Sequence, residues 1–492
     1  MSFILGISLG LEGDSVGPPA GSGGGGGGGF TPIETDLAYY LNAQTGIYSD
    51  AGITEATDGQ AIQQINDQST SAITATNTEV GYQATYAVAS VNGLNSLRLE
   101  ISNAKDTYFL SSEVALTDNL FTLHAIYKKD ALADSALLMA DYQNTFQDQG
   151  GYFVLLASAA YNPYNEGDEW TVVTFKRDNA NGFYSFYVNG IVLKNFSSTT
   201  STAQAIDRLF QRPSARTGEY NVGDMLIYTQ AQSNTDIATI QNGLNTKYGN
   251  LFLPLDDAPA PPTIGSTTLD LYINPDFNTY SDLGKTAATN TDYVRAAKST
   301  AKGMQSITQG TAVNQFQLQN TVLPNSKASL NKSVTSARYL MIDSLSYSAS
   351  ESYVVYGVIK RDNSSGTAAI IGSELLYTST IHWQNNTVYW RDGGNASFSA
   401  TIPMTNDIVV NAFVVDRASG EMRVYKNGSL SGTVDISGST NGVVHNMLYN
   451  RRINGNTEMD FGITLVYGGL HSASNVVTVS DWINTNYGGL IY

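Results

Sequence analysis

The sequence predicts an all-β protein built from two tandem antiparallel β-sandwiches. Only 14% of the 492 residues are charged, and the 46 glycines accompany many Ser, Thr, Asn and Tyr residues. Short apolar runs recur between Gly, Asn, Asp or Ser turn residues, which is typical of antiparallel sheets. The same long pattern appears twice along the chain, and such a repeat indicates one structural unit used twice.

The clearest predicted element is a hairpin within residues 168–190. Trp170–Phe175 and Phe183–Val188 are apolar, β-branched or aromatic runs, and the second ends in Asn189-Gly190. Asn-Gly favours a type I′ turn because both central residues of that turn need φ > 0. The pattern returns at residues 406–428, so we interpret the hairpin as scaffold and expect binding chemistry in the loops beside it.

The repeat extends over most of the chain with a nearly constant offset. The segment LAYYLNAQTGIYSDAG from Leu37 corresponds to LDLYINPDFNTYSDLG from Leu269, 232 positions later. The offset is 238 at the Asn-Gly turns and 239 at the ends of the copies. The matched residues include Tyr40 and Tyr272, Asp50 and Asp282, Asn189 and Asn427, and Tyr248 and Tyr487. A tandem duplication is therefore the firmest inference from the sequence.

The duplication divides the chain into four predicted parts. Residues 1–30 form an apolar peptide followed by a run of seven glycines, residues 31–253 the first sandwich, and residues 266–492 the second. Residues 254–265 between them hold four prolines and predict a semi-rigid linker. Ser233 is a predicted N-cap, and Ile237, Ile240, Leu244 and Tyr248 supply the apolar face of a closing helix.

Composition excludes several classes of partner and site. A net charge of −17 disfavours nucleic-acid binding, and the absence of cysteine excludes disulfides and thiolate metal sites. The apolar start is too short and too rich in glycine to span a bilayer, so we expect no membrane insertion. Calcium remains open, because Asp141, Asp148, Asp168 and Glu169 supply loop carboxylates, but no EF-hand spacing supports it. We expect no cofactor.

The order of motifs resembles the concanavalin A-like lectin/glucanase (laminin G-like) jelly-roll domains of phage and bacterial surface proteins. The motifs are the Tyr-x-Asn strand with its Ser-Asp, a strand ending Lys-Lys-Asp or Lys-Arg-Asp, Val-Asn-Gly or Lys-Asn-Gly, and the terminal Lys-Tyr-Gly or Asn-Tyr-Gly. The resemblance covers residues 35–253 and 266–490. It implies two curved, face-to-face sheets and binding of sugars or protein partners; fold alone does not settle function.

The catalytic motif of the related glucanases is incomplete. Their carboxylates lie on one strand, spaced Glu-x-Asp-x-x-Glu or Glu-x-Asp-x-Glu, so that two acids share a face. The nearest sequence is Glu458-Met459-Asp460, which lacks the third acid. The four histidines, at positions 124, 382, 445 and 471, show no metal-binding spacing. We therefore expect a protein that is not an enzyme, with a polysaccharide hydrolase or lyase as the alternative.

Two groups of residues are candidate sugar contacts, because sugars bind flat aromatic faces beside planar polar groups. Each aromatic residue alone is better explained by the core or by chance exposure than by sugar binding. Our predicted contacts are Tyr161, Tyr164 and Asn165 in the first copy, and Trp383, Asn385 and Trp390 in the second.

The apolar start of the chain is the predicted anchor, with the glycine run as its leash. Its residues are Phe3, Ile4, Leu5, Ile7 and Leu9. We expect a virion-surface structural protein of a bacteriophage, such as a head fibre, decoration protein or tail-associated adhesin. Its predicted partners are other virion proteins, bound through the arm, and host-surface glycans, with homo-oligomers on the particle. A purely architectural bracing protein is a further alternative.

Overall fold

The structure is a computed structural model that describes most of the chain. The described residues are 30–100, 108–116, 120–129, 135–139, 145–149, 152–155, 169–178, 183–197, 205–210, 219–253, 258–282, 284–299, 301, 306–308, 315–320, 323–332, 340–361, 367–373, 379–394, 396–403, 407–449 and 459–486.

The first copy forms two antiparallel sheets. Sheet A has the order β14-β13-β12-β8-β16-β6-β5, with β1 also pairing with β16, and sheet B has the order β11-β10-β9-β15-β7-β4-β3-β2. The strands of sheet A are β1 (Leu37–Leu41), β5 (Thr85–Val91), β6 (Leu94–Glu100), β8 (Phe121–Lys129), β12 (Thr171–Asp178), β13 (Phe183–Val188), β14 (Ile191–Ser197) and β16 (Glu219–Tyr228). Those of sheet B are β2 (Ile47–Tyr48), β3 (Gln64–Asn66), β4 (Thr74–Thr76), β7 (Tyr108–Ala115), β9 (Ser135–Met139), β10 (Thr145–Gln149), β11 (Tyr152–Leu155) and β15 (Ala205–Leu209).

The second copy repeats this plan in sheets C and D. Sheet C has the order β19-β22-β23-β34-β25-β30-β31-β32 with β17 on β34, and sheet D the order β18-β20-β21-β24-β33-β26-β27-β28-β29. The strands of sheet C are β17 (Thr268–Ile273), β19 (Tyr293–Val294), β22 (Phe316–Gln319), β23 (Ser329–Lys332), β25 (Tyr353–Arg361), β30 (Val409–Asp416), β31 (Glu421–Lys426), β32 (Ser429–Asp435) and β34 (Met459–Gly468). Those of sheet D are β18 (Thr279–Tyr280), β20 (Ala296–Lys298), β21 (Ser306–Thr308), β24 (Leu340–Tyr347), β26 (Thr367–Gly372), β27 (Thr380–Gln384), β28 (Thr387–Arg391), β29 (Ser397–Thr401) and β33 (Val443–Leu448).

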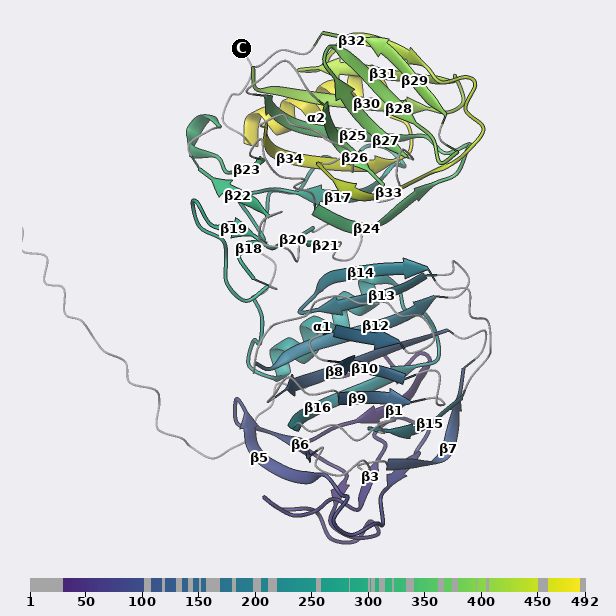
Figure 1. Cartoon of the computed structure of the whole chain (residues 1–492), viewed down its shortest axis with the longest axis vertical. Helices are drawn as coiled ribbons and strands as arrows, with labels where there is room; N and C mark the ends of the chain where they lie inside the picture. Colours follow the sequence, from purple (N-terminus) through teal and green to yellow (C-terminus); the bar gives the residue numbers. More distant parts are fainter. Residues whose placement is uncertain are drawn as a thin grey trace, which may run out of the picture.

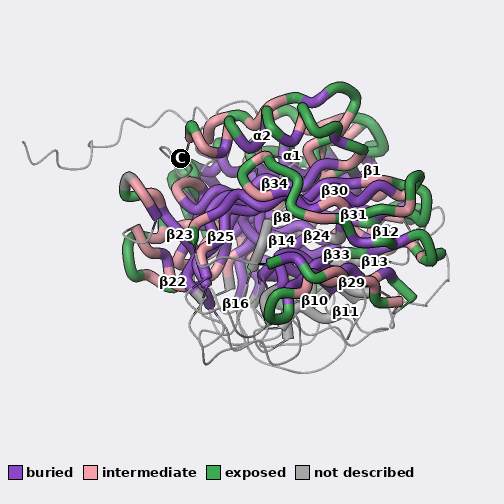
Figure 2. The backbone as a smooth tube through the Cα atoms, turned by 90° about the horizontal axis from the view of Figure 1, so that it is seen from above, coloured by how far each residue is buried: buried purple, intermediate pink, exposed green. Residues whose placement is uncertain are grey.

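Each copy is a sandwich with one helix on its outer side, which confirms the predicted fold class. One apolar core lies between sheets A and B and another between sheets C and D. Smaller clusters join helix α1 (Asn234–Lys247) to sheet A and helix α2 (Ala473–Asn486) to sheet C. Figures 1 and 2 show both helices on the same side of the molecule, with the buried strands beside them.

The predicted helix of the first copy begins where its capping signal lies. The Ser233 hydroxyl accepts a hydrogen bond from the Asp236 N–H at 3.1 Å, which satisfies one of the free amides of the first turn. Ile237, Ile240, Leu244 and Tyr248 are all buried, as their spacing predicts. In α2 the residues Val476, Val479 and Ile483 occupy the same face, while Tyr487 lies outside the described residues.

The predicted Asn-Gly turns are confirmed, and they do more than reverse the chain. Asn189 and Gly190 have φ of 52° and 77°, and Asn427 and Gly428 have φ of 50° and 77°, as a type I′ turn requires. The Asn427 side chain also accepts a hydrogen bond from the Val410 N–H at 2.9 Å, across the neighbouring strand. Asn189 does the same with Val172 at 3.1 Å. The repeated asparagine therefore joins three strands of each sandwich.

The repeated Ser-Asp also has a structural role in both copies. The Asp50 carboxylate accepts hydrogen bonds from the N–H groups of Ile53 and Thr54, each at 2.8 Å. Asp282 receives the equivalent bonds from Lys285 and Thr286 at 2.8 and 2.9 Å. These bonds hold the pKa of Asp50 below its usual value. The aspartate thus closes a tight loop after the first short strand of sheets B and D.

The two sandwiches dock onto each other at one end of sheet A (Figure 1). The edge strand β14 packs against β20, β21 and β24 of sheet D. Tyr280 and Ala296 of the second copy belong to the same apolar cluster as Ile191 of the first. The Leu253 N–H donates to the Gly284 carbonyl at 2.8 Å, and Lys285 pairs with Glu169 at 2.5 Å.

A buried lysine lies in this junction. The Lys298 side chain is almost fully buried, and its ammonium lies 4.4 Å from the centre of the Phe252 ring and 5.1 Å from that of Tyr280. It also donates to the Leu253 carbonyl at 3.3 Å. Burial lowers the pKa of Lys298 to about 7, against the opposing effect of the Asp282 carboxylate. The aromatic rings stabilise the ammonium where water is excluded.

Replacing the turn asparagine of the second sandwich separates its two roles. Asn427→Gly keeps the favourable φ > 0 but leaves the buried Val410 N–H without its acceptor, so we expect the second sandwich to lose about 1–2 kcal/mol. Asn427→Ala adds left-handed strain and should cost more. Tryptophan fluorescence during urea unfolding is the measurement, because Trp383, Trp390 and Trp482 lie in this half. Equal stability of Asn427→Gly and the natural protein would contradict the strand-joining role.

Candidate functional site

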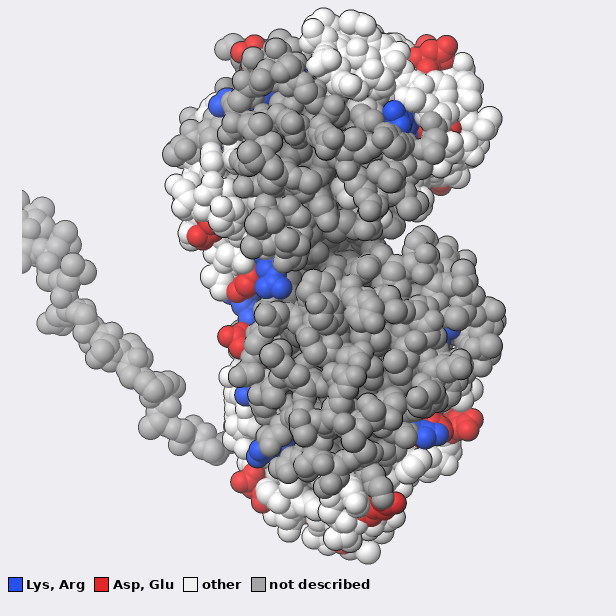
Figure 3. All heavy atoms as spheres, in the orientation of Figure 1, with Lys and Arg blue, Asp and Glu red and all other residues white. Residues whose placement is uncertain are grey.

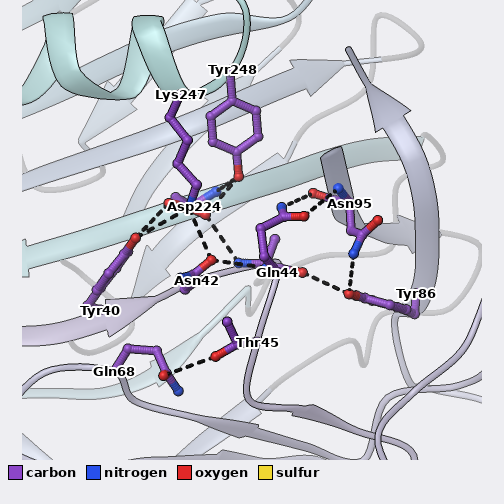
Figure 4. A network of polar contacts seen from close by, with 11 residues as sticks. Tyr40, Asn42, Gln44, Thr45, Gln68, Tyr86, Asn95, Asp224, Lys247 and Tyr248 are labelled. Atoms are coloured by element: carbon purple, nitrogen blue, oxygen red, sulfur yellow. Dashed lines mark hydrogen bonds and ion pairs between the residues drawn. The ribbon is translucent and has the colours of Figure 1, made fainter. Parts of the chain in front are cut away.

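A polar network lies where the end of α1 meets sheet A (Figure 4). The helix ends at Lys247, and the following Tyr248 extends its hydroxyl to the middle of β16. Gly223 makes this approach possible, since a Cβ atom there would lie only 2.8 Å from the Tyr248 hydroxyl. The neighbouring strand β1 contributes Tyr40, and the loop after it contributes Asn42 and Gln44.

Asp224 is the centre of this network, and both of its carboxylate oxygens are engaged. Oδ1 accepts hydrogen bonds from the Tyr248 hydroxyl at 2.7 Å and the Ala43 N–H at 3.2 Å. Oδ2 accepts from the Tyr40 hydroxyl at 2.9 Å and pairs with the Lys247 ammonium at 2.5 Å. The Asp224 side chain is fully buried and that of Lys247 is 8% exposed. The carboxylate is therefore saturated and neutralised.

This arrangement does not suit acid–base chemistry. Burial raises the pKa of both Tyr40 and Tyr248, and the adjacent Asp224 carboxylate raises them further, so both hydroxyls stay protonated. A general base needs a free lone pair within reach of a substrate proton. Asp224 offers none, because each oxygen already has two partners.

The outer part of the network consists of neutral amides. The Gln44 amide and the Asn95 backbone exchange two hydrogen bonds, of 3.0 and 3.1 Å. The Asn95 amide donates to the Tyr86 hydroxyl at 2.6 Å, and Asn42 accepts from Lys247 at 3.1 Å. Asn42, Gln44 and Asn95 are half-buried and so lie at the protein surface. Planar amides of this kind bind hydroxyl-rich neutral ligands in proteins.

The second sandwich lacks the charged centre of this network. Ile463 occupies the position of Asp224, and Asn486 that of Lys247, at the offset of 239. Ile463 is fully buried in the cluster beneath α2. The Tyr-x-Asn pair remains, but here the Asn274 amide donates to the Tyr272 hydroxyl at 3.1 Å. The network is therefore specific to the first copy, whereas the scaffold is common to both.

The predicted sugar contacts of the second copy require a correction. Trp383 and Trp390 are both fully buried in the core between sheets C and D. Trp383 packs edge-on against Phe413, and the Trp390 indole N–H donates to the Tyr353 hydroxyl at 2.9 Å. Neither ring presents a face to a sugar, and of the three only Asn385 is exposed, in the β27–β28 turn. Tyr161, Tyr164 and Asn165 lie outside the described residues.

The carboxylate and histidines considered for catalysis are engaged in the fold. Asp460 is 1% exposed and accepts hydrogen bonds from Ser329 and Asn331, each at 3.1 Å, while Glu458 lies outside the described residues. His445 is bonded to the Ser379 carbonyl and the Tyr353 hydroxyl at 2.8 and 3.1 Å.

All four histidines are buried, and each contacts neighbouring polar groups or aromatic rings. Burial lowers the pKa of His124 and His445 to about 4, so both are neutral at pH 7.

Among the described residues, no three His, Cys, Asp or Glu side chains gather as a metal site would require. Of the calcium candidates, Glu169 pairs with Lys285, while Asp141 and Asp168 and the side chain of Asp148 lie outside the description. The predicted anchor residues Phe3, Ile4, Leu5, Ile7 and Leu9 also lie outside it. The described helices are all too short or too polar to cross a bilayer. Among the described residues visible in Figure 3, charged side chains of both signs are scattered and form no large patch of one sign.

Comparisons with known proteins yield only distant likenesses. No family model and no curated protein matches the sequence. Among solved structures, the botulinum neurotoxin serotype D ligand binding domain in complex with N-acetylneuraminic acid is 12% identical, with a TM-score of 0.31 over 90% of this chain and 97% of that one. The binding domain of Paraclostridial Mosquitocidal Protein 1 is 10% identical, with a TM-score of 0.31 over 87% of this chain and 97% of that one. Trypanosoma rangeli sialidase is 9% identical, with a TM-score of 0.32 over 87% of this chain and 60% of that one. Likenesses at this level carry no inference about the site or activity of this chain.

The sequence indicates Tyr40 and Tyr248 as repeated residues, whereas the repeat does not indicate Asp224 or Lys247. The available signal was the acid in VGDMLIY, an otherwise apolar strand whose counterpart reads FGITLVY. A carboxylate in a buried strand is rare unless it is paired. Its absence from the second copy shows that the strand itself does not need it.

Breaking the ion pair tests whether the network stabilises the first sandwich. Lys247→Met leaves Asp224 buried without its counter-charge, so we expect a loss of about 3 kcal/mol in unfolding free energy. The double variant Asp224→Ile, Lys247→Asn adopts the residues of the second copy and should lose less than Lys247→Met alone. The measurement is the free energy of unfolding of both variants in urea, compared with that of the natural protein. A single variant as stable as the natural protein would show that the pair contributes nothing.

Proposed function

We propose that this protein is a non-enzymatic structural protein that presents two docked β-sandwiches for binding carbohydrate or another surface. The observation that carries the proposal is that both Asp224 carboxylate oxygens are fully hydrogen-bonded in the interior. Around them, the neutral amides of Asn42, Gln44 and Asn95 form a half-buried rim. The Gln44 and Asn95 amides already bond within the protein, but an amide has two N–H donors and an oxygen with two lone pairs, so each retains capacity for a hydroxyl group. The buried centre has no free base for hydrolysis. The engagement of Asp460 in the second copy supports the same view.

We place the protein on the surface of a virion, as a phage head fibre, decoration protein or tail-associated adhesin. The support is in the sequence: an apolar peptide, residues 3–9, precedes seven glycines, and this order suits an anchor on a leash. The arm would bind other virion proteins, while the sandwiches face outward toward host glycans. Several copies on one particle would raise the avidity of weak sugar contacts without new contacts in any one site.

An architectural role is the second candidate function, and the junction between the sandwiches favours it. Edge strand β14 is covered by sheet D, and the two copies share an apolar cluster that includes Ile191 and Tyr280. A pair of sandwiches fixed in this way suits a brace between neighbouring subunits as well as a display module.

A glycan array with the full chain tests the binding proposal. We expect weak binding, with dissociation constants near 1 mM for single sugars, and a loss of at least fivefold on Gln44→Ala or Asn95→Ala. Asn290→Ala, at an exposed amide of the other sandwich that is not a predicted sugar contact, is the matched control and should bind normally. Absence of binding at millimolar sugar would contradict carbohydrate binding and leave the bracing role.

Incubation with laminarin, agar, alginate and capsular polysaccharide tests the non-enzymatic part. We expect no new reducing or unsaturated ends. Their appearance, and their loss on Asp460→Asn, would instead establish a hydrolase or lyase.

A further inference from the structure

The chain contains two copies of one unit, and the contact between them joins two different surfaces. We call these the edge surface, made of the Asn-Gly turn and the start of the strand after it, and the loop surface, made of the Ser-Asp loop and the two short strands beside it. In the junction, the edge surface of the first copy (residues 189–191) meets the loop surface of the second (residues 279–298). A Cβ atom on Gly284 would lie 3.1 Å from the Ile191 side chain and 3.4 Å from the Asn189 carbonyl.

A contact between unlike surfaces of two repeats leaves one surface of each kind unused. The loop surface of the first copy (residues 47–66) and the edge surface of the second (residues 427–430) have no partner copy in the chain. Figure 1 shows β3 and β32 at opposite ends of the molecule, with the junction between them. Contacts of this heterologous kind extend from molecule to molecule unless a rotation closes them into a ring.

The free loop surface has the same backbone shape as the one in the junction. The Asn66 N–H donates to the Gly46 carbonyl at 2.8 Å. In the other copy the Lys298 backbone N–H donates to the Asn278 carbonyl at 2.9 Å. The bond from Ser49 to Thr54, at 3.0 Å, likewise recurs from Ser281 to Thr286 at 3.1 Å. Isolated bridges join Tyr48 to Glu55 and Tyr280 to Ala287 at the same offset of 232. The first copy thus offers the geometry that the second uses.

The loop surface of the first copy is less buried than that of the second, as expected if only the second has a partner docked on it. Tyr280, Ala296 and Lys298 are buried in the junction, whereas the corresponding Tyr48, Gln64 and Asn66 are only half-buried.

Each free surface also exposes one large aliphatic side chain. Ile53, at the position of Lys285, is 85% exposed, and Leu430, at the second position of β32, is 58% exposed. Strand β29 packs against β32 but leaves Ser429, Leu430 and Ser431 exposed.

We propose that this protein associates with a second copy of itself head to tail, the β32 edge of one chain docking on the Ser49–Glu55 loop of the next. The intermolecular contact repeats the internal junction with Leu430 and Ile53 as its apolar centre. Asp407, the counterpart of Glu169, would lie near Ile53 of the neighbour, where the junction has Lys285.

The intermolecular contact should be the weaker of the two. Inside the chain the linker supplies a high effective concentration, and the buried Tyr280 and Ile191 have a half-buried Tyr48 and an exposed Ser429 as counterparts. The net charge of −17 also makes copies repel each other at low ionic strength. We therefore expect association that grows with protein concentration between about 10 μM and 1 mM and that increases with added salt.

Analytical ultracentrifugation of the full chain and of two charge variants tests the proposal. Ile53→Asp places a second carboxylate near Asp407 of the neighbour, and Leu430→Asp removes the apolar contact, so each should weaken association at least tenfold. Ile53→Lys restores the charge pattern of the Lys285–Glu169 pair and should associate at least as well as the natural protein. Val444→Asp, at a 37% exposed position on β33, is the control and should behave normally.

Mixing the two Asp variants tests the head-to-tail geometry itself. Ile53→Asp keeps an intact edge surface and Leu430→Asp an intact loop surface, so the mixture should form dimers that neither variant forms alone. The proposal is overturned if the natural chain stays monomeric at 1 mM in high salt, if both Asp variants associate normally, or if the mixture yields no dimer.

These outcomes are independent of the glycan array, because Gln44 and Asn95 are separate from the residues substituted here. Failure of self-association would leave the binding proposal standing, and failure of sugar binding would leave this one standing.

Discussion

The covering of a sheet edge is the constraint on which the arrangement of the molecule depends. Strand β14 ends sheet A, and an uncovered edge strand presents backbone groups that invite pairing with other chains. Sheet D of the second copy covers it, with Ile191 fully buried and the Lys298 ammonium close to the rings of Phe252 and Tyr280. A buried lysine loses hydration, and the adjacent rings and Asp282 offset only part of that loss. The apolar cluster around it must supply the remainder.

The two copies keep one scaffold and differ in the polar groups that it carries. Asn189 and Asn427 make the same cross-strand bond. Two equivalent positions differ in charge between the copies. Asp224 of the first copy corresponds to Ile463 of the second, and Lys298 of the second corresponds to Asn66 of the first. Both of these charges are buried: Asp224 lies beneath the end of α1, and Lys298 lies in the junction against Phe252 and Leu253 of the first copy. The first copy thus carries the polar network, and the second carries the lysine that is buried in the junction.

The sequence predicted the features that depend on local pattern. The type I′ turns, the Ser233 cap and the buried face of α1 follow from residue types at fixed spacing, and the structure confirms them. Trp383 and Trp390 were misassigned because an aromatic residue beside amides gives the same pattern in a core strand as in a binding loop. Side chains of these strands point alternately toward the C–D core and away from it. Which set of side chains points inward depends on the register of pairing across the sheet. The sequence does not predict the contact between Asp224 and Lys247, because 23 positions that include helix α1 separate the two residues in the chain.

The two sandwiches form one docked body, and a distance measurement between them tests this most directly. The chain has no cysteine, so Val88→Cys and Val444→Cys, both at exposed strand positions in different copies, accept one spin label each. Double electron–electron resonance should give a single narrow distance distribution, unchanged by salt in dilute protein. A broad distribution, as expected for two sandwiches moving freely about the proline-rich linker, would contradict the account.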